Sequence, residues 1–320
     1  MNKGMRILFA GNKERGVQCL RALAAAQYTI IGVIAHPLGN RPRTPGGVAD
    51  HALQMGIPLF QPDDVNHPEV IARLRALAPD LTILAGYGPI VKQEFIDCAP
   101  LGCINLHGGK LPQYRGSSPM NWALINGDCE FTLSIIRVDT GVDTGDVLIE
   151  RTFPIGIDDT IADLQATANR AFPEMLLEVL SQIQNGTDRA RKQESAEARY
   201  FPLRFPEDGL ILWDLLTAEQ VHNKIRALTD PYPGAFTYYQ KRRVKLLRST
   251  LMKGEFHGEP GRVYRKSIQG LLVCAMDRCL WIQRAYMEPD GGDLFDQIQR
   301  YDKLATVRDL AVAGLVRDGK

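Results

Sequence analysis

The chain has 320 residues, of which 45% are hydrophobic and 23% charged, values typical of a folded globular protein rather than a disordered, collagenous or coiled-coil chain. With 38 Lys and Arg against 37 Asp and Glu, its net charge of +1 provides no overall attraction to nucleic acid or to an anionic membrane. Because this length exceeds what one core usually accommodates, two domains are expected.

The first apolar run, Ile7–Ala10, is too short for a signal-peptide core or a membrane span. Six cysteines form no Cys-x-x-Cys pair, and we expect them to be reduced thiols. Neither they nor the six histidines show zinc-type spacing, so no metal site is predicted. These features predict a cytoplasmic protein that does not bind a membrane.

Short apolar runs alternate with helical patterns over the first part of the chain. Strands are predicted at Met5–Ala10, Thr29–Ala35, Leu81–Ala85, Gly102–His107, Phe131–Ile136 and Val147–Phe153. Helices are predicted at Arg15–Ala26, Gly47–Met55, Pro68–Ala78, Pro119–Asn126 and Ile161–Ile183. Because the early strands are almost continuously apolar, they are typical of parallel strands covered on both faces. The pattern predicts a doubly wound, mostly parallel α/β sheet, a Rossmann-like fold.

The pattern changes after about residue 195. A stretch rich in turn residues predicts a linker over 195–209, between domains at 1–194 and 210–320. One helix is predicted at Ala218–Leu228, and five short strands at Ala235–Tyr239, Val244–Leu251, Gly261–Arg265, Leu271–Met276 and Cys279–Tyr286. This composition favours a small antiparallel β-barrel as the second domain.

The first strand–turn–helix does not have the pattern of a nucleotide-binding loop. Its turn, Gly11–Gly16, lacks the Gly-x-Gly pair of a dinucleotide site and the Gly-Lys-Ser/Thr of a Walker loop. Lys13 and Arg15 remain candidate phosphate contacts, with two solvated charges at a helix start as the alternative.

Asn105 and His107 are the strongest candidates for chemistry. Residues two apart in a strand point to the same side, here near the carboxyl end, where open α/β sheets bind ligands. A histidine can move a proton near neutral pH, and a neighbouring amide can stabilise a developing oxyanion. The pair therefore suits acyl transfer, although a strand-end histidine can also be purely structural.

An acidic, glycine-rich loop, Val138–Asp146, follows the predicted strand Phe131–Ile136. Its two Asp-Thr-Gly copies are too close together for an aspartic protease. A calcium loop starting at Asp139 would need other residues where Gly141 and Thr144 stand. Two interpretations of the loop remain: it is a structural turn, or it supplies a carboxylate that supports His107.

A third segment, Tyr87–Ile90, follows the strand Leu81–Ala85. Its glycines expose backbone amides and carbonyls, which suits recognition of the edge of a flat heterocycle. By itself the segment would be only a tight turn.

Together these segments resemble the 10-formyltetrahydrofolate-dependent formyltransferases. The shared residues are Asn105-Leu106-His107, Leu111-Pro112, Tyr114-Arg115-Gly116 and Asp139-Thr140-Gly141-Val142-Asp143-Thr144-Gly145. The similarity is also visible in Trp213 and Asp230–Thr237, and the family's second domain is an open, OB-like β-barrel.

The resemblance implies an enzyme that moves a formyl group from 10-formyltetrahydrofolate to an amine through a tetrahedral intermediate. It makes Asn105 and His107 the stabilisers of the oxyanion, and Asp143 the residue that orients His107. It also implies a homodimer formed through the second domain. The expected folate contacts are Tyr87, Gly88, Pro89, Ile90, Gly109, Val138, Asp139 and Thr140.

Two amine acceptors occur in this family: methionyl initiator tRNA and nucleotide-linked amino sugars. The tRNA branch has an extended basic loop, whereas 36–46 here holds two arginines and no lysine. Several stretches look like the domain that formylates UDP-4-amino-4-deoxy-arabinose, among them Pro62–Pro68, Tyr114–Trp122 and Phe205–Gly209. We therefore expect a nucleotide-linked amino sugar as the substrate.

Two alternatives remain open: the tRNA acceptor and a folate-binding protein without catalysis. In favour of tRNA, Lys241–Arg248 places five basic residues in eight positions. The family often has Ser-Leu where this chain has Gly109-Lys110. The candidate contacts for an anionic substrate are Lys13, Arg15, Lys110 and Arg204.

Overall fold

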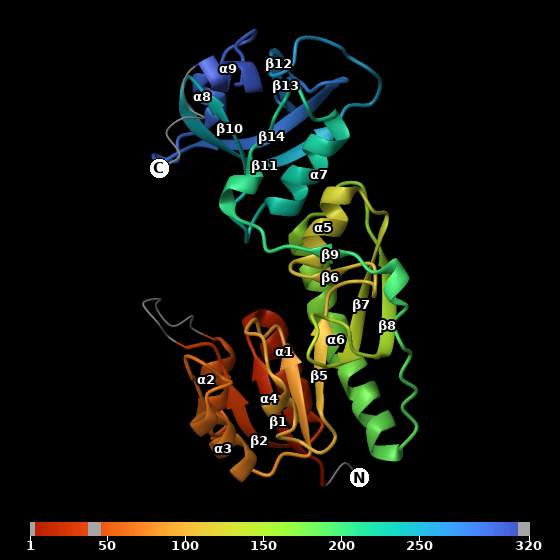
Figure 1. The fold of residues 1–320 in the computed structure, drawn as a ribbon. Helices are drawn as coiled ribbons and strands as arrows, with labels where there is room; N and C mark the ends of the chain where they lie inside the picture. Colours follow the sequence, from red (N-terminus) through yellow and green to blue (C-terminus); the bar gives the residue numbers. More distant parts are fainter. Residues whose placement is uncertain (1–3, 38–45, 313–320) are drawn as a thin grey trace. The chain divides into compact units, whose positions relative to one another are not determined.

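A computed structural model describes residues 4–37 and 46–312 (Figure 1). The described chain divides into two compact units. The N-terminal unit holds the residues up to Pro119 together with Phe131–Phe153 and Ala166–Pro202, and the C-terminal unit holds Met120–Glu130, Pro154–Gln165 and the residues from Leu203 onward. Two short segments that lie before residue 166 in the sequence therefore belong to the C-terminal unit. The limits predicted at 194 and 210 stay a prediction.

The N-terminal unit is built on a seven-stranded sheet with the order β3-β2-β1-β4-β5-β7-β8. The first five strands of this order pair in parallel, and β7 runs antiparallel to β5. The strands are β1 Arg6–Gly11, β2 Thr29–Ile34, β3 Leu59–Phe60, β4 Leu81–Ala85, β5 Cys103–His107, β7 Glu130–Arg137 and β8 Val147–Pro154. Every residue of β4 is buried, Thr82 included, as its almost continuously apolar sequence predicts.

Six helices lie between or after these strands in the chain. They are α1 Lys13–Ala25, α2 Val48–Gln54, α3 Pro68–Ala76, α4 Gln93–Ile96, α5 Pro119–Asn126 and α6 Ile161–Asn185. A two-stranded sheet pairs β6 Arg115–Gly116 with β9 Tyr200–Phe201, and two 3-10 turns span Ser195–Glu197 and Pro206–Gly209. The predicted Rossmann-like, mostly parallel sheet is confirmed. Sequence analysis missed β3, β6, β9 and α4 because segments of two to four residues show no periodicity.

The C-terminal unit contains a separate five-stranded antiparallel sheet with the order β10-β11-β14-β13-β12. Its strands are β10 Ala235–Tyr239, β11 Arg242–Leu251, β12 Val263–Ser267, β13 Gly270–Cys274 and β14 Cys279–Met287. The predicted OB-like second domain is confirmed. The expectation of a single helix was wrong, because α8 Leu294–Gln297 and α9 Val307–Val312 follow α7 Ala218–Leu228. Both are too short to produce a clear amphipathic pattern.

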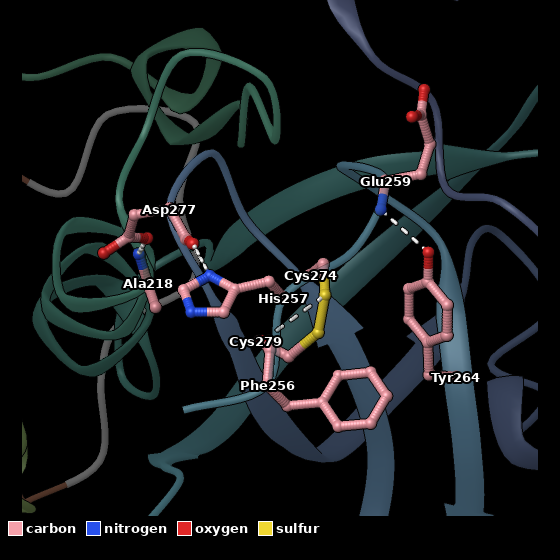
Figure 2. Close-up of a disulfide and its surroundings, with 8 residues drawn as sticks. All are labelled: Ala218, Phe256, His257, Glu259, Tyr264, Cys274, Asp277 and Cys279. Atoms are coloured by element: carbon pink, nitrogen blue, oxygen red, sulfur yellow. Dashed lines mark hydrogen bonds between the residues drawn. A yellow bond between two sulfur atoms is a disulfide. The ribbon is translucent and has the colours of Figure 1, made fainter. Parts of the chain in front are cut away.

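Cys274 and Cys279 form a disulfide at the end of the β13–β14 hairpin (Figure 2). The two residues are direct cross-strand partners, a proximity that their spacing in the sequence does not reveal. The expectation of six reduced thiols was therefore wrong for this pair. The connecting turn contacts α7, because Asp277 Oδ1 accepts a hydrogen bond from the backbone N–H of Ala218 at 2.7 Å.

Counting thiols tests this disulfide. Alkylation of the denatured protein without a reductant should modify four cysteines, Cys19, Cys98, Cys103 and Cys129, and two more after reduction. Intact-mass measurement gives both counts. Six modified cysteines in the unreduced protein would contradict the disulfide.

Within the described residues, no helix is both long enough and apolar enough to cross a membrane.

Candidate active site

Strand β5 brings Asn105 and His107 to the same side, near its carboxyl end. β5 lies between β4 and β7, and His107 is the direct cross-strand partner of Ser134. His107 is buried, with 5% of its surface exposed, and Asn105 is half-buried. Flanking strands therefore fix the backbone that carries both side chains.

The Asp143 carboxylate meets both of these side chains. Its Oδ1 lies 3.5 Å from Asn105 Nδ2 and 3.5 Å from His107 Nδ1. Its Oδ2 accepts a hydrogen bond from the backbone N–H of Gly116 at 2.9 Å. An amide, an imidazole and a carboxylate that were predicted from separate motifs thus converge on one point.

The loop that carries Asp143 folds back on the end of β7. Asp139 Oδ1 accepts hydrogen bonds from the Gly141 N–H at 3.0 Å and from the Thr144 hydroxyl at 2.5 Å. A Cβ atom at position 145 would lie 1.9 Å from the Arg137 carbonyl oxygen, so this close approach requires glycine. Asp143 itself has a φ of +53°, a left-handed conformation that a non-glycine residue rarely adopts.

The second ring nitrogen of His107 also faces an acceptor. Nε2 lies 2.6 Å from the carbonyl oxygen of Tyr114. The Asp143 carboxylate lies beside the other nitrogen, Nδ1. Each ring nitrogen therefore faces an acceptor, and a ring that carries an N–H on both nitrogens could donate to both. These surroundings suit a histidine that gains a proton during the reaction. A Cβ atom at Gly109 would lie 2.7 Å from the Cβ of Tyr114, which explains why the turn after His107 needs a glycine.

The segment Tyr87–Ile90 is exposed at its last three residues, while the Tyr87 ring is buried in the core. Burial, with a smaller contribution from Asp64, raises the pKa of Tyr87 to about 12. Burial and Lys13 lower the pKa of His36, which keeps it neutral, and its Nε2 accepts the N–H of Gly88 at 3.3 Å. Tyr87 therefore anchors the segment and leaves the backbone beyond it accessible.

Ile90 and Val142 are apolar side chains that remain 75% and 49% exposed. One belongs to the segment after β4 and the other to the Asp143 loop, the two places where folate contacts were predicted. Among the remaining predicted contacts, Val138 packs against the core, Asp139 and Thr140 are exposed, and Gly109 is buried. Exposed apolar groups beside exposed backbone fit a flat, hydrogen-bonding pterin ring.

The four candidate contacts for an anionic substrate have different surroundings. Lys13 and Lys110 are exposed. Arg15 is half-buried, with Nη1 at 3.4 Å from the Leu106 carbonyl and its guanidinium 4.7 Å from the centre of the Phe172 ring. Arg204 belongs to the C-terminal unit, where its guanidinium lies 4.9 Å from the centre of the Trp122 ring. Arg15 is thus the candidate in contact with the strand that carries Asn105 and His107.

The basic segment Lys241–Arg248 lies at the start of β11 and is partly neutralised. Arg242 forms an ion pair with Asp290 at 2.6 Å, and Arg243 forms one with Glu288 at 3.1 Å. Two of its five positive charges therefore already have acidic partners.

Sequence analysis missed three contacts that hold the site: the Tyr114 carbonyl, the Gly116 N–H and the Gln193 side chain. Tyr114 and Gly116 are part of the motif that carried the family resemblance, but a motif does not reveal that their backbone atoms face His107 and Asp143. Gln193 lies in an irregular segment with no motif around it. Its amide Nε2 donates to the carbonyl oxygens of Asp143 at 2.9 Å and Gly145 at 2.6 Å.

Comparison with known proteins agrees with this geometry. Residues 5–180 match the formyl transferase family, and residues 205–292 match the formyl transferase C-terminal domain. The chain belongs to the formyl transferase family. It is a 10-formyltetrahydrofolate-dependent N-formyltransferase, and the predicted enzyme class and co-substrate are confirmed.

Its curated relatives match nearly the whole chain. The methionyl-tRNA formyltransferase of Desulfotalea psychrophila is 35% identical over 90% of each chain, and that of Geobacter sulfurreducens is 36% identical over 89% of this chain and 90% of its own. Other curated relatives, at 34–36% identity, carry the same name. Among solved structures, an N-formyltransferase from Helicobacter canadensis in complex with folinic acid and dTDP-3-aminofucose has a TM-score of 0.69. It is 18% identical and covers 87% of this chain and 98% of its own, so it shows the shared fold.

The expectation of a nucleotide-linked amino sugar as the acceptor was wrong. It rested on short stretches and on a weakly basic segment at 36–46, most of which, including both of its arginines, lies outside the described residues. Identity at about 35% over about 90% of the chain favours the alternative acceptor, and it covers far more residues than those stretches. The homodimer and the cytoplasmic location stay predictions.

In the described ranges 4–37 and 46–312, no three His, Cys, Asp or Glu side chains come together as metal ligands would.

Replacing Asp143 tests whether its contact with Asn105 and His107 matters for the reaction. Asp143→Asn should lower kcat by about 10²–10⁴-fold, because the amide loses the negative charge that supports His107. Folate affinity should change by less than about three-fold. Asp97→Asn, an exposed aspartate on the same unit, serves as the control. Unchanged turnover in Asp143→Asn would remove Asp143 from the reaction.

Proposed function

We propose that this enzyme transfers the formyl group of 10-formyltetrahydrofolate to the methionine amine of methionyl initiator tRNA. The observation that carries this proposal is the identity of about 35%, over about 90% of the chain, to methionyl-tRNA formyltransferases. The exposed basic side chains Lys241 and Arg248 would then be free to meet RNA phosphates, which attract cations strongly at low salt.

In the proposed reaction, Asn105 and His107 act on the formyl oxygen. The folate supplies the formyl carbon that the amine attacks. Asn105 Nδ2 and the ring of His107 are N–H donors on the same side of β5, and both contact Asp143 Oδ1 at 3.5 Å. Donors held in place before the reaction stabilise charge on an oxygen without reorganising. His107 also accepts the proton that the amine loses and delivers it to N10 of the folate as the bond between N10 and the formyl carbon breaks, which releases tetrahydrofolate.

Asp143 supports both donors in this scheme. Its carboxylate lies beside His107 Nδ1 and stabilises the positive charge that the ring gains, as the acidic member of a catalytic triad does. Its second oxygen is held by Gly116, so the carboxylate has a defined orientation.

The folate would bind through the backbone of Gly88–Ile90 and of Val138–Thr140. Ile90 and Val142 would cover the faces of its ring, and Gly109 would leave room beside His107. We also propose that 1–194 form the catalytic domain, 195–209 the linker and 210–320 the OB-like domain.

Formyl transfer to charged tRNA tests the proposed acceptor. The enzyme should release tetrahydrofolate in the presence of methionyl initiator tRNA, and digestion of the product should yield formylmethionine by mass spectrometry. Uncharged tRNA, which has no methionine amine, is the matched control and should be inert.

The same assay with nucleotide-linked 3-amino and 4-amino sugars as acceptors can contradict the proposal. If one of these sugars gains the mass of a formyl group while methionyl-tRNA remains unchanged, the proposed acceptor is wrong.

A further inference from the structure

Gln193 connects the backbone of the Asp143 loop to the segment that contacts His107. Its Nε2 donates hydrogen bonds to the carbonyl oxygens of Asp143 at 2.9 Å and Gly145 at 2.6 Å. Its Oε1 accepts one from Arg115 Nε at 3.0 Å. The amide thus uses both of its N–H donors and its oxygen, a combination that a carboxylate or a hydroxyl does not offer.

These contacts form a closed ring of hydrogen bonds around the carboxylate. Arg115 is followed by Gly116, whose N–H donates to Asp143 Oδ2 at 2.9 Å. The ring therefore runs from the Asp143 carbonyl through Gln193, Arg115 and Gly116 back to the Asp143 side chain. Both the backbone and the carboxylate of Asp143 are fixed by it.

The segment 191–201 is itself anchored at both ends. Arg191 pairs with Val147 through two backbone hydrogen bonds of 2.8 Å, next to the Asp143 loop. At the other end, β9 pairs with β6, and the Arg115 guanidinium donates to the Tyr200 hydroxyl at 2.8 Å. Gln193 is therefore held in place from both sides.

We propose that Gln193 is a positioning residue that sets the orientation of the Asp143 carboxylate toward His107 and Asn105. Asp143 has a φ of +53°, a conformation that is uncommon for residues other than glycine, so contacts that hold the backbone here bear directly on where its carboxylate points. The two hydrogen bonds from Gln193 hold the carbonyls of Asp143 and of Gly145, which stands two residues later. This inference rests on the proposed role of Asp143 and does not depend on which amine is formylated.

Gln193→Glu distinguishes the donor function of the amide from its acceptor function. The variant keeps the side-chain volume and the acceptor for Arg115, but it replaces both donors with an oxygen that repels the loop carbonyls. We expect kcat to fall by about 10–100-fold, because small displacements of a catalytic group reduce the rate this strongly. KM for 10-formyltetrahydrofolate should change by less than about three-fold. Gln269→Glu, at an exposed turn of the C-terminal unit, is the control for added charge.

A double-mutant cycle with Asp143→Asn distinguishes positioning from general destabilisation. If Gln193 acts through Asp143, adding Gln193→Glu to Asp143→Asn should lower kcat by less than about three-fold more. Multiplicative losses, or an unchanged kcat in Gln193→Glu alone, would overturn the proposal. The proposal would also be overturned if Gln193→Glu alone abolished turnover while Asp143→Asn alone kept the wild-type kcat.

Hydrogen exchange provides a measurement independent of activity. Peptides covering 138–147 should exchange faster in Gln193→Glu than in the wild type, while peptides from β1 and β4 remain unchanged. Equal exchange in 138–147 would contradict the proposal, and faster exchange throughout the unit would show a folding defect instead. Only the assay of the wild-type enzyme with different acceptors tests which amine is formylated. If the proposed acceptor is wrong, that assay fails, whereas the comparison of hydrogen exchange between Gln193→Glu and the wild type still holds.

Discussion

The contact between the Asp143 carboxylate and the His107 ring is the interaction on which the rest of the site depends. The nearest atoms of the two groups lie 3.5 Å apart in surroundings that are largely closed to water, where electrostatic interactions are screened less than at the surface. The sheet fixes His107, whereas Asp143 lies in a loop with an uncommon backbone conformation. The structure must therefore hold the loop to maintain the contact.

Several parts of the chain share this task. Asp139 and Gly145 shape the loop from within, Gly116 holds one carboxylate oxygen, and Gln193 holds the backbone. These residues are far apart in sequence, yet β7 and β8 place the loop between them beside β5, and the pairing of β6 with β9 draws the later segment to the same place. The seven-stranded sheet thus functions as a rigid support for a loop that would not keep its conformation alone.

The sequence predicted the features that depend on local pattern. Almost continuous apolar runs indicated β1 and β4, and the two-residue spacing of Asn105 and His107 placed them on one side of β5. It could not show the Cys274–Cys279 bridge, because the spacing of the two residues does not reveal that they pair across a hairpin. Nor could it show the role of Gln193, which contacts residues about fifty positions earlier in the chain. The acceptor was misjudged for a similar reason. A count of charges in 36–46 covers one short segment of the sequence, whereas proteins bind nucleic acid through many phosphate contacts.

A crystal structure with a stable analogue of 10-formyltetrahydrofolate tests the central claim most directly. We predict that the formyl oxygen lies within hydrogen-bond distance of Asn105 Nδ2 and the His107 ring. The pterin should contact the backbone of Gly88–Ile90, and Asp143 should remain beside His107 Nδ1. A formyl group that faces away from Asn105 and His107, or a folate bound elsewhere on the sheet, would contradict the account.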